Sequence, residues 1–480
     1  MCDDVAAWSS RAAVNAIRDR RISVSEYARC LLGRCAEESL GAFVSCDERA
    51  VLDAAAQADR ADRRGPVHGV LVAVKDNIDV AGHPTTAGTP ALRAHRPGRD
   101  AEIWRRLRAA GALALGKTNM HELAVGITGN NPGFGPVRNP WAADRFAGGS
   151  SSGSAAAVAA FLAPAGLGTD TGGSVRIPAA LCAVFGYRPS AGRYPQRGLV
   201  LLSRTRDTAG FLTRTMRDIV LLDSVVAAPG PAPEPVRWAG LRLGVPRRPF
   251  WEGLEPSLAA VAERRLEELS AAGAVLVEAD LPAGAGASLA RDAMTVALYE
   301  AAWEIPYYLA QTSAAPTLDQ VLAQIASPGV RAALNDALGP ARVPAADYRA
   351  ACANLSRVAG ALSDHQRAHR LSALVHPTTP LPAQPFACEE SVVIDGREHP
   401  TFPTFIRNTD WAGVLGLPAL SLPAGLTADG LPVGLELCAP AGADAHLLQM
   451  GCAYEEIWPP PVLEPATAHR PGLPPKVPGR

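Results

Sequence analysis

The stretch GLGTDTGGSVRIPAALC, residues 166–182, places one serine, Ser174, directly after two glycines in an otherwise small and apolar run. Asp170 precedes this serine by four residues, and no histidine stands near it in the sequence. Glycines let a carbonyl group approach the backbone, and the successive N–H groups of TDTGGS can stabilise a developing oxyanion. The stretch therefore predicts a nucleophilic serine whose base comes from another part of the chain.

Lysine is scarce in this chain, and its few positions are informative. Of the 46 basic residues only Lys75, Lys117 and Lys476 are lysines, in a composition typical of a GC-rich genome. Arginine replaces lysine on a surface, but it cannot lose its proton near neutral pH. Each lysine is therefore a candidate for a role that needs a neutral amine.

Two further stretches supply what Ser174 lacks. The run GVLVAVK, residues 69–75, predicts a strand that ends on Lys75, and AGGSSSGSAAAVAA, residues 147–160, carries Ser150 in a loop before an alanine-rich helix. A buried lysine whose pKa falls from about 10.4 toward neutrality can act as a base. A second serine can pass the proton from the nucleophile to that lysine. Lys75, Ser150 and Ser174 together predict a proton relay without histidine.

The same stretches also fit other enzymes. GxSxG around Ser151 is the signature of an α/β-hydrolase esterase, although that motif must follow a strand directly and here follows the turn-forming RNPWAADRFA. The loop lacks the lysine of a phosphate-binding GxxxxGK[ST] motif. The single DTG lacks the second carboxylate of an aspartic protease. The esterase with Ser151 as nucleophile stays open as an alternative.

Composition excludes several classes of partner. The 480 residues include 46 basic and 47 acidic ones, so we expect no basic face for nucleic acid or an anionic membrane. The longest apolar run, AAAVAAFLAPAG, is broken by Pro164, and the N-terminus carries acids where a signal peptide needs positive charge. Nine cysteines without CxxC or CxH spacing favour reduced thiols over a disulfide or zinc framework. We therefore expect a cytoplasmic protein that holds no metal.

The order of the elements predicts an α/β fold. ISVSEYARCLLGRC begins with Ser23 and Glu26 at capping-box spacing, and EIWRRLRAAGALALGKTN predicts a helix followed by a strand. A proline-rich connector at 228–235 precedes a second strand and helix, residues 290–370 have a helical pattern, and LSALVHPTTPLP and LGLPALSLPAGL predict buried strands. The proline-rich tail after Trp458 is expected to be loose.

Four motifs, in order, resemble the core of the amidase signature hydrolases: VAVKDNIDV, GKTNMHELAVG, GGSSSGSAAAVAA and GLGTDTGGSVRIPAA. The resemblance spans residues 5–455, more weakly over 230–370, and implies a large mixed central β-sheet covered by helices on both faces. It implies one domain over 1–458, with a signature core at 65–225, a variable helical substrate-shaping region at 250–370, a return to the core at 371–455, and a tail at 459–480.

The resemblance also assigns the site. It implies a Ser–cisSer–Lys triad of Ser174, Ser150 and Lys75, and it places the substrate amide on the backbone carbonyl of Ala124. The implied oxyanion hole is formed by the backbone of Ser174 and of three residues before it, namely Thr171, Gly172 and Gly173.

Two positions depart from the family pattern, and neither belongs to the triad. Ser152 stands where glycine is usual, which costs about 1 kcal/mol if that position needs a positive φ. Phe211 stands where proline is commoner.

Within the family, HELAVGITGNNPGFGPVRNP and GYRPSAGRYP are most similar to indoleacetamide and mandelamide hydrolases. This implies a cofactor-free hydrolase that converts an arylacetamide-like primary amide to a carboxylate and ammonia through an acyl-enzyme. A glutamine-hydrolysing subunit of a glutamyl-tRNA amidotransferase, which works with a partner chain, is the alternative within the family. The preferred acyl group and a homodimeric state are left open.

The remaining polar residues are expected to be structural. We expect Asp170 and Arg176 to form a structural ion pair under the loop, and we expect Lys117 to have a structural role. His365 and His369 share a helix face but lack a third metal ligand. His121 either lines the mouth of the pocket or caps a turn, and the sequence leaves both open.

Overall fold

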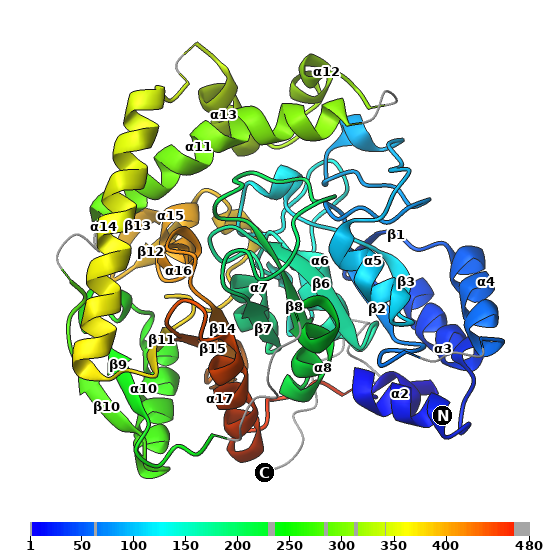
Figure 1. Ribbon diagram of the computed structural model, residues 1–480, viewed down its shortest axis with the longest axis horizontal. Helices are drawn as coiled ribbons and strands as arrows, with labels where there is room; N and C mark the ends of the chain where they lie inside the picture. The colour runs from blue at the N-terminus through cyan, green and yellow to red at the C-terminus, as the bar shows by residue number, and fades with distance from the viewer. Residues whose placement is uncertain are drawn as a thin grey trace.

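A computed structural model describes residues 2–61, 65–228, 236–282, 287–311, 315–340 and 342–464. Within these ranges one mixed sheet of eleven strands crosses the molecule (Figure 1). Its strands, in spatial order, are β1 (Phe43–Ser45), β3 (Leu113–Thr118), β2 (Leu71–Lys75), β6 (Ala165–Asp170), β8 (Thr208–Thr213), β7 (Phe185–Arg188), β14 (Ala419–Leu426), β15 (Pro432–Cys438), β11 (Ala373–Pro377), β9 (Arg242–Val245) and β10 (Val275–Glu278).

The sheet contains two groups of parallel strands, separated by a run of antiparallel pairs. β2 is parallel to both β3 and β6, and β9 is parallel to both β10 and β11. The pairs between β6 and β11 in the spatial order are antiparallel, as is the β1–β3 pair at one edge. Two short hairpins lie outside the sheet, β4 (Arg138–Asn139) with β5 (Ala142–Phe146) and β12 (Ser391–Ile394) with β13 (Arg397–Pro400). The predicted large mixed sheet is confirmed.

Helices cover both faces of the sheet, because successive side chains of a strand point to opposite sides. In β2, Val72 and Val74 join one apolar core with α5 (Glu102–Ala109), α8 (Met216–Val226), α10 (Pro256–Ala271) and α17 (Asp444–Ile457). Leu71 and Ala73 join a second core with α2 (Ser10–Arg18), α3 (Val24–Glu37), α4 (Glu48–Asp59), α6 (Ser152–Ala159) and α7 (Arg176–Cys182). Both layers agree with the expected helices on two faces.

The region expected to be helical forms an arch along one side of the molecule (Figure 1). It consists of α11 (Ala287–Ala310), α12 (Leu318–Ala323), α13 (Pro328–Leu338) and α14 (Ala345–His369). α11 contacts the other three helices and also α16 (Asp410–Val414). The remaining short helices are α1 (Cys2–Ala6), α9 (Arg247–Phe250) and α15 (Thr401–Ile406), with single turns η1 (Pro90–Leu92), η2 (Glu122–Ala124) and η3 (Phe386–Cys388).

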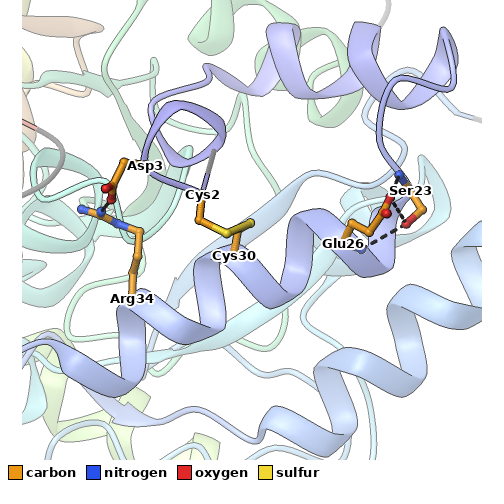
Figure 2. Close-up of a disulfide and its surroundings, with 6 residues drawn as sticks. All are labelled: Cys2, Asp3, Ser23, Glu26, Cys30 and Arg34. Atoms are coloured by element: carbon orange, nitrogen blue, oxygen red, sulfur yellow. Dashed lines mark hydrogen bonds and ion pairs between the residues drawn. A yellow bond between two sulfur atoms is a disulfide. The ribbon is translucent and has the colours of Figure 1, made fainter.

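The prediction of reduced cysteines is wrong for one pair. Cys2 on α1 and Cys30 on α3 form a disulfide, with Cα atoms 5.1 Å apart, within the usual range for this bond (Figure 2). The two helices pack against each other, which spacing in the sequence could not reveal. The seven other cysteines are free. The capping box of Ser23 and Glu26 is present at the start of α3, as predicted (Figure 2).

The proline-rich segments are only partly described. The connector at 228–235 lies outside the described residues except for Ala228, and so does the tail from residue 465 onward. The described part of the tail is not loose throughout, because Leu463 is buried against the core that contains α6. None of the helices in the described ranges is long and apolar enough to cross a membrane.

Candidate active site

The predicted triad residues lie where the parallel strands of the sheet end. β2 ends on Lys75 and its parallel neighbour β6 ends on Asp170, so both carboxyl ends open at the same edge, where α/β sheets carry their sites. Ser174 lies in the turn between β6 and α7, and Ser150 lies just before α6. Residues separated by up to 99 positions in the chain are thus brought to one point.

Lys75 is fully buried and contacts hydroxyl groups. Its Nζ donates to Ser150 Oγ at 2.8 Å and to Thr169 Oγ1 at 2.8 Å, and it lies 3.4 Å from the Thr169 carbonyl. Asn77 Nδ2 donates to the same Thr169 hydroxyl at 3.0 Å. The sequence analysis did not predict that Thr169 contacts Lys75. Its position near the end of β6, the strand next to the one that ends on Lys75, could have indicated this contact.

Burial lowers the pKa of Lys75 to about 7, although the charges of Asp170 and Asp207 act in the opposite direction. Removal of an ammonium from water disfavours the charged form, and here that effect is larger than the attraction of the two acids. The nearby His121 is also buried, and burial together with the charge of Lys75 lowers its pKa to about 4. His121 is therefore neutral over the range in which Lys75 titrates.

Backbone hydrogen bonds hold the segment of Ser150 against the segment of Ser174. The Gly149–Ser150 peptide is cis, the Ser151 N–H donates to the Ser174 carbonyl at 3.0 Å, and the His121 N–H donates to the Ser150 carbonyl at 3.2 Å. Ser174 keeps 7 % of its surface exposed, whereas Ser150 and Lys75 are fully buried. Of these three residues, only Ser174 therefore has any surface in contact with solvent.

Ser151, the nucleophile of the esterase alternative, is occupied by other contacts. Its Oγ donates to the Thr169 carbonyl at 3.1 Å and accepts the Thr169 N–H at 3.3 Å, and the residue is fully buried. The strand before it, β5, belongs to a separate hairpin and not to the central sheet. Neither feature fits a nucleophile elbow, which presents its serine at the top of the main sheet.

The turn after β6 is fixed by Asp170. Its carboxylate accepts the N–H of Gly173 at 2.9 Å and the N–H of Val175 at 3.1 Å. Gly173 has φ of +136°, a conformation open to glycine, and a Cβ at this position would lie 2.1 Å from Thr409 Oγ1. The Gly173 N–H, one of the four expected oxyanion donors, is therefore engaged inside the protein.

A buried ionic cluster holds Asp170 in turn. Arg176 pairs with Asp170 at 2.9 Å and with Glu436 at 2.7 Å, and Arg188 also pairs with Asp170, at 3.0 Å. All four side chains are fully buried, and the two arginines hold the pKa of Asp170 well below its usual range. Burial instead raises the pKa of Glu436 to about 7. The predicted Asp170–Arg176 ion pair is confirmed, and Arg188 and Glu436 are additions that the sequence did not suggest.

Lys117, the second buried lysine, has a structural environment as predicted. Its Nζ lies 3.2 Å from the Asp76 carboxylate and donates to the Pro84 carbonyl at 2.8 Å and to Thr85 Oγ1 at 3.0 Å. His365 and His369 lie with ring centres 4.6 Å apart on α14, and the described residues contain no group of three or more His, Cys, Asp or Glu residues suited to a metal.

The segment that carries Ala124 is anchored on the helical arch. Leu123 and Ala124 both have left-handed φ angles, +52° and +60°, which set the direction of the Ala124 carbonyl. Glu122 is buried, and its carboxylate accepts the N–H groups of Ala326, at 3.0 Å, and Ser327, at 2.7 Å, just before α13. The predicted contact residue therefore belongs to a loop whose position depends on the arch.

The two departures from the family pattern are accommodated. Ser152 is the first residue of α6 and lies outside the positive-φ region, so the expected penalty does not arise. Phe211 is buried in β8 within the core that contains α5 and α8.

Comparison with known proteins identifies the family of the chain. The profile of the family described as Amidase matches residues 26–448. The chain is 39 % identical to an indoleacetamide hydrolase of Agrobacterium vitis, over 92 % of this chain and 95 % of that protein, and 39 % identical to a mandelamide hydrolase of Pseudomonas putida, over 92 % and 89 %. The crystal structure of a peptide amidase from Stenotrophomonas maltophilia superposes with a TM-score of 0.83 at 31 % identity, covering 95 % of this chain and 98 % of that one.

Proposed function

The chain belongs to the amidase signature family and is an amide hydrolase, and from that premise we propose that it cleaves an arylacetamide-like primary amide through a Ser174 acyl-enzyme. Of the proteins named above, the indoleacetamide hydrolase and the mandelamide hydrolase act on amides of this kind, as their names state. The products are a carboxylate and ammonia, and water resolves the acyl-enzyme.

The observation that carries this proposal is the contact between Lys75 Nζ and Ser150 Oγ at 2.8 Å, in a buried site where the pKa of Lys75 is about 7. A neutral lysine has a lone pair with which it can accept a proton, whereas an ammonium has none. Near neutral pH, Lys75 therefore passes between its two protonation states at little cost, as a general base must.

In the proposed reaction the Ser174 oxygen attacks the carbonyl carbon of the amide. The Ser174 proton passes to Ser150, and the Ser150 proton passes to Lys75, so that Lys75 becomes charged while an oxyanion forms. The proton then returns by the same path to the amide nitrogen, the C–N bond breaks, and ammonia leaves. Water repeats the sequence on the acyl-enzyme and releases the carboxylate.

The oxyanion faces the backbone of the TDTGGS turn. Because the Gly173 N–H donates to Asp170, we assign the donors to Thr171, Gly172 and Ser174. Asp207 supports this turn through a hydrogen bond with the Thr171 side chain. The Ala124 carbonyl accepts the N–H of the substrate amide and thereby directs the nitrogen toward the relay.

The test is a panel of primary amides assayed for ammonia release, followed by mass analysis after labelling with a fluorophosphonate. We expect arylacetamides to be cleaved faster than aliphatic amides, and the label to lie on the peptide that contains Ser174. A label on Ser151 would replace the mechanism with that of an esterase. If glutamine is the one amide that is hydrolysed, and if its hydrolysis requires a second protein, the chain is an amidotransferase subunit instead.

A further inference from the structure

One peptide group of the TDTGGS turn is held at both ends. The carbonyl of Gly172 accepts a hydrogen bond of 2.6 Å from Thr409 Oγ1, and the N–H of Gly173, on the other side of the same peptide bond, donates to Asp170 at 2.9 Å. A peptide group is planar, so these two contacts fix its orientation. Two successive glycines would otherwise leave this peptide free to rotate.

Thr409 is itself held firmly. It is fully buried, its N–H donates to the Ile406 carbonyl at 3.0 Å, and its own carbonyl accepts from Arg176 Nη1 at 2.9 Å. Arg176 is the residue that also pairs with Asp170. Asp170 and Thr409, which both hydrogen-bond to the glycine peptide, are therefore both bound by the guanidinium of Arg176.

We propose that Thr409 is a positioning residue for the oxyanion site, which acts by holding the Gly172 carbonyl. With the central peptide fixed, the peptides on either side of it point the N–H groups of Gly172 and Ser174 in set directions. Thr409 touches neither the substrate nor the reacting atoms. This inference rests on the proposed function, because it concerns the oxyanion that the Ser174 mechanism creates.

The shape of the site supports a close fit at this point. A Cβ on Gly173 would lie 2.1 Å from Thr409 Oγ1, so the threonine fills the space directly beneath the turn. On the neighbouring residue, a Cβ on Gly172 would lie 2.3 Å from Asp410 Oδ1, and Asp410 pairs with Arg206. The glycines thus pack against the segment that begins α16, and Thr409 is the residue there that donates to the turn.

The test compares Thr409→Val with Thr409→Ser. Valine keeps the shape but lacks the donor, and serine keeps the donor but lacks the methyl group. Loss of an oxyanion donor itself lowers kcat about 10²- to 10³-fold. We expect Thr409→Val to lower kcat by about 10- to 100-fold, below that range because the donors remain. KM should change less than about threefold, and Thr409→Ser should keep most of kcat, the reverse of what a packing role predicts.

A fluorophosphonate gives a second readout, since its phosphoryl oxygen occupies the oxyanion site. Its rate of reaction with Ser174 should fall in Thr409→Val by the same factor as kcat. The matched control is Thr404→Val on α15, a threonine that is also buried and whose hydroxyl donates to the Pro400 carbonyl at 2.7 Å rather than to the turn. This control should keep the wild-type kcat.

Three results would overturn the inference: Thr409→Val with a kcat within twofold of wild type, Thr409→Ser as impaired as Thr409→Val, or an equal loss in Thr404→Val. If Thr409→Val does not fold, the serine variant decides, because full impairment in a protein that keeps the donor contradicts the assignment. Failure of the proposed function looks different: the wild type would then release no ammonia, or Ser174→Ala would still release it.

Discussion

The two buried lysines lie on adjacent parallel strands, yet they have opposite surroundings. Lys117 lies 3.2 Å from the carboxylate of Asp76, whereas Lys75 donates to the hydroxyls of Ser150 and Thr169. Burial lowers the pKa of both, but only Lys117 has an acid in direct contact to favour its charged form. A lysine beside hydroxyls can exchange a proton with them, and a lysine beside a carboxylate is held as an ion. The difference teaches that the partner of a buried lysine, and not burial alone, decides how strongly its charged form is favoured.

The largest expected effect is that of Lys75→Arg. Arginine keeps the charge but stays protonated, so it cannot accept the Ser150 proton. Loss of a general base lowers the rate about 10²- to 10⁴-fold. We expect the rate of Ser174 acylation to fall nearly as far in Lys75→Arg as in Lys75→Ala, with no recovery at high pH. A folded Lys75→Arg enzyme that retains more than about a tenth of the wild-type acylation rate would remove Lys75 from the mechanism.

A substitution at Lys117, the other buried lysine, should lower the free energy of unfolding. Lys117→Met leaves the carboxylate of Asp76 buried without its cation, and breaking a buried pair in this way costs about 3–5 kcal/mol. Urea unfolding should show this loss in the free energy of unfolding. The double variant Lys117→Met with Asp76→Asn should recover part of it, and an unchanged stability in Lys117→Met would show that the ion pair contributes little.

The pH dependence of acylation should reveal the base. In the proposed mechanism Lys75 acts when neutral, so the rate should be constant above its pKa of about 7 and fall about tenfold per pH unit below it. Glu436 also has a pKa of about 7, but Glu436→Gln keeps the acceptor for Arg176 and removes this titration. The fall in rate below about pH 7, which is the acidic limb of the pH–rate profile, should therefore persist in Glu436→Gln. Its disappearance in that variant would assign the limb to Glu436.

The smallest expected effect is a displacement of this limb. The charge of Asp207 raises the pKa of Lys75, so Asp207→Asn should lower that pKa and move the limb to lower pH by a fraction of a unit. Asparagine can still accept the N–H groups of Leu202 and Ser203, which the carboxylate now accepts. Stopped-flow acylation between pH 5 and 8 would measure the displacement, and a move to higher pH would contradict the assigned electrostatics.

Much of this arrangement was readable from the sequence, because local motifs encode it. The strand that ends on Lys75, the loop before α6 and the turn of Ser174 each follow from residues that are neighbours in the chain. The helices on both faces of the sheet were expected from the resemblance to the amidase signature hydrolases, and the apolar runs predicted only that strands such as β2, β11 and β14 are buried. The fold class could therefore be stated in advance, and the motifs proved to lie close together in space.

The supporting contacts could not be read in this way, because they join distant segments. Thr409 reaches Gly172 across 237 positions, and Glu436 reaches Arg176 across 260. No periodicity or spacing connects such residues, since their contact depends on the order of strands in the sheet. The Cys2–Cys30 disulfide escaped prediction for the same reason, as it depends on the packing of α1 against α3.

The long reach of these contacts has a consequence for the newly synthesised protein. A ribosome builds the chain from its N-terminus, so Lys75, Ser150 and Ser174 are all present once residue 174 has been added. The hydroxyl of Thr409 and the carboxylate of Glu436, which hold the turn and its arginine, are added only after a further 235 and 262 residues. The nascent chain thus carries every atom of the proposed relay well before it contains the residues that hold the turn in shape.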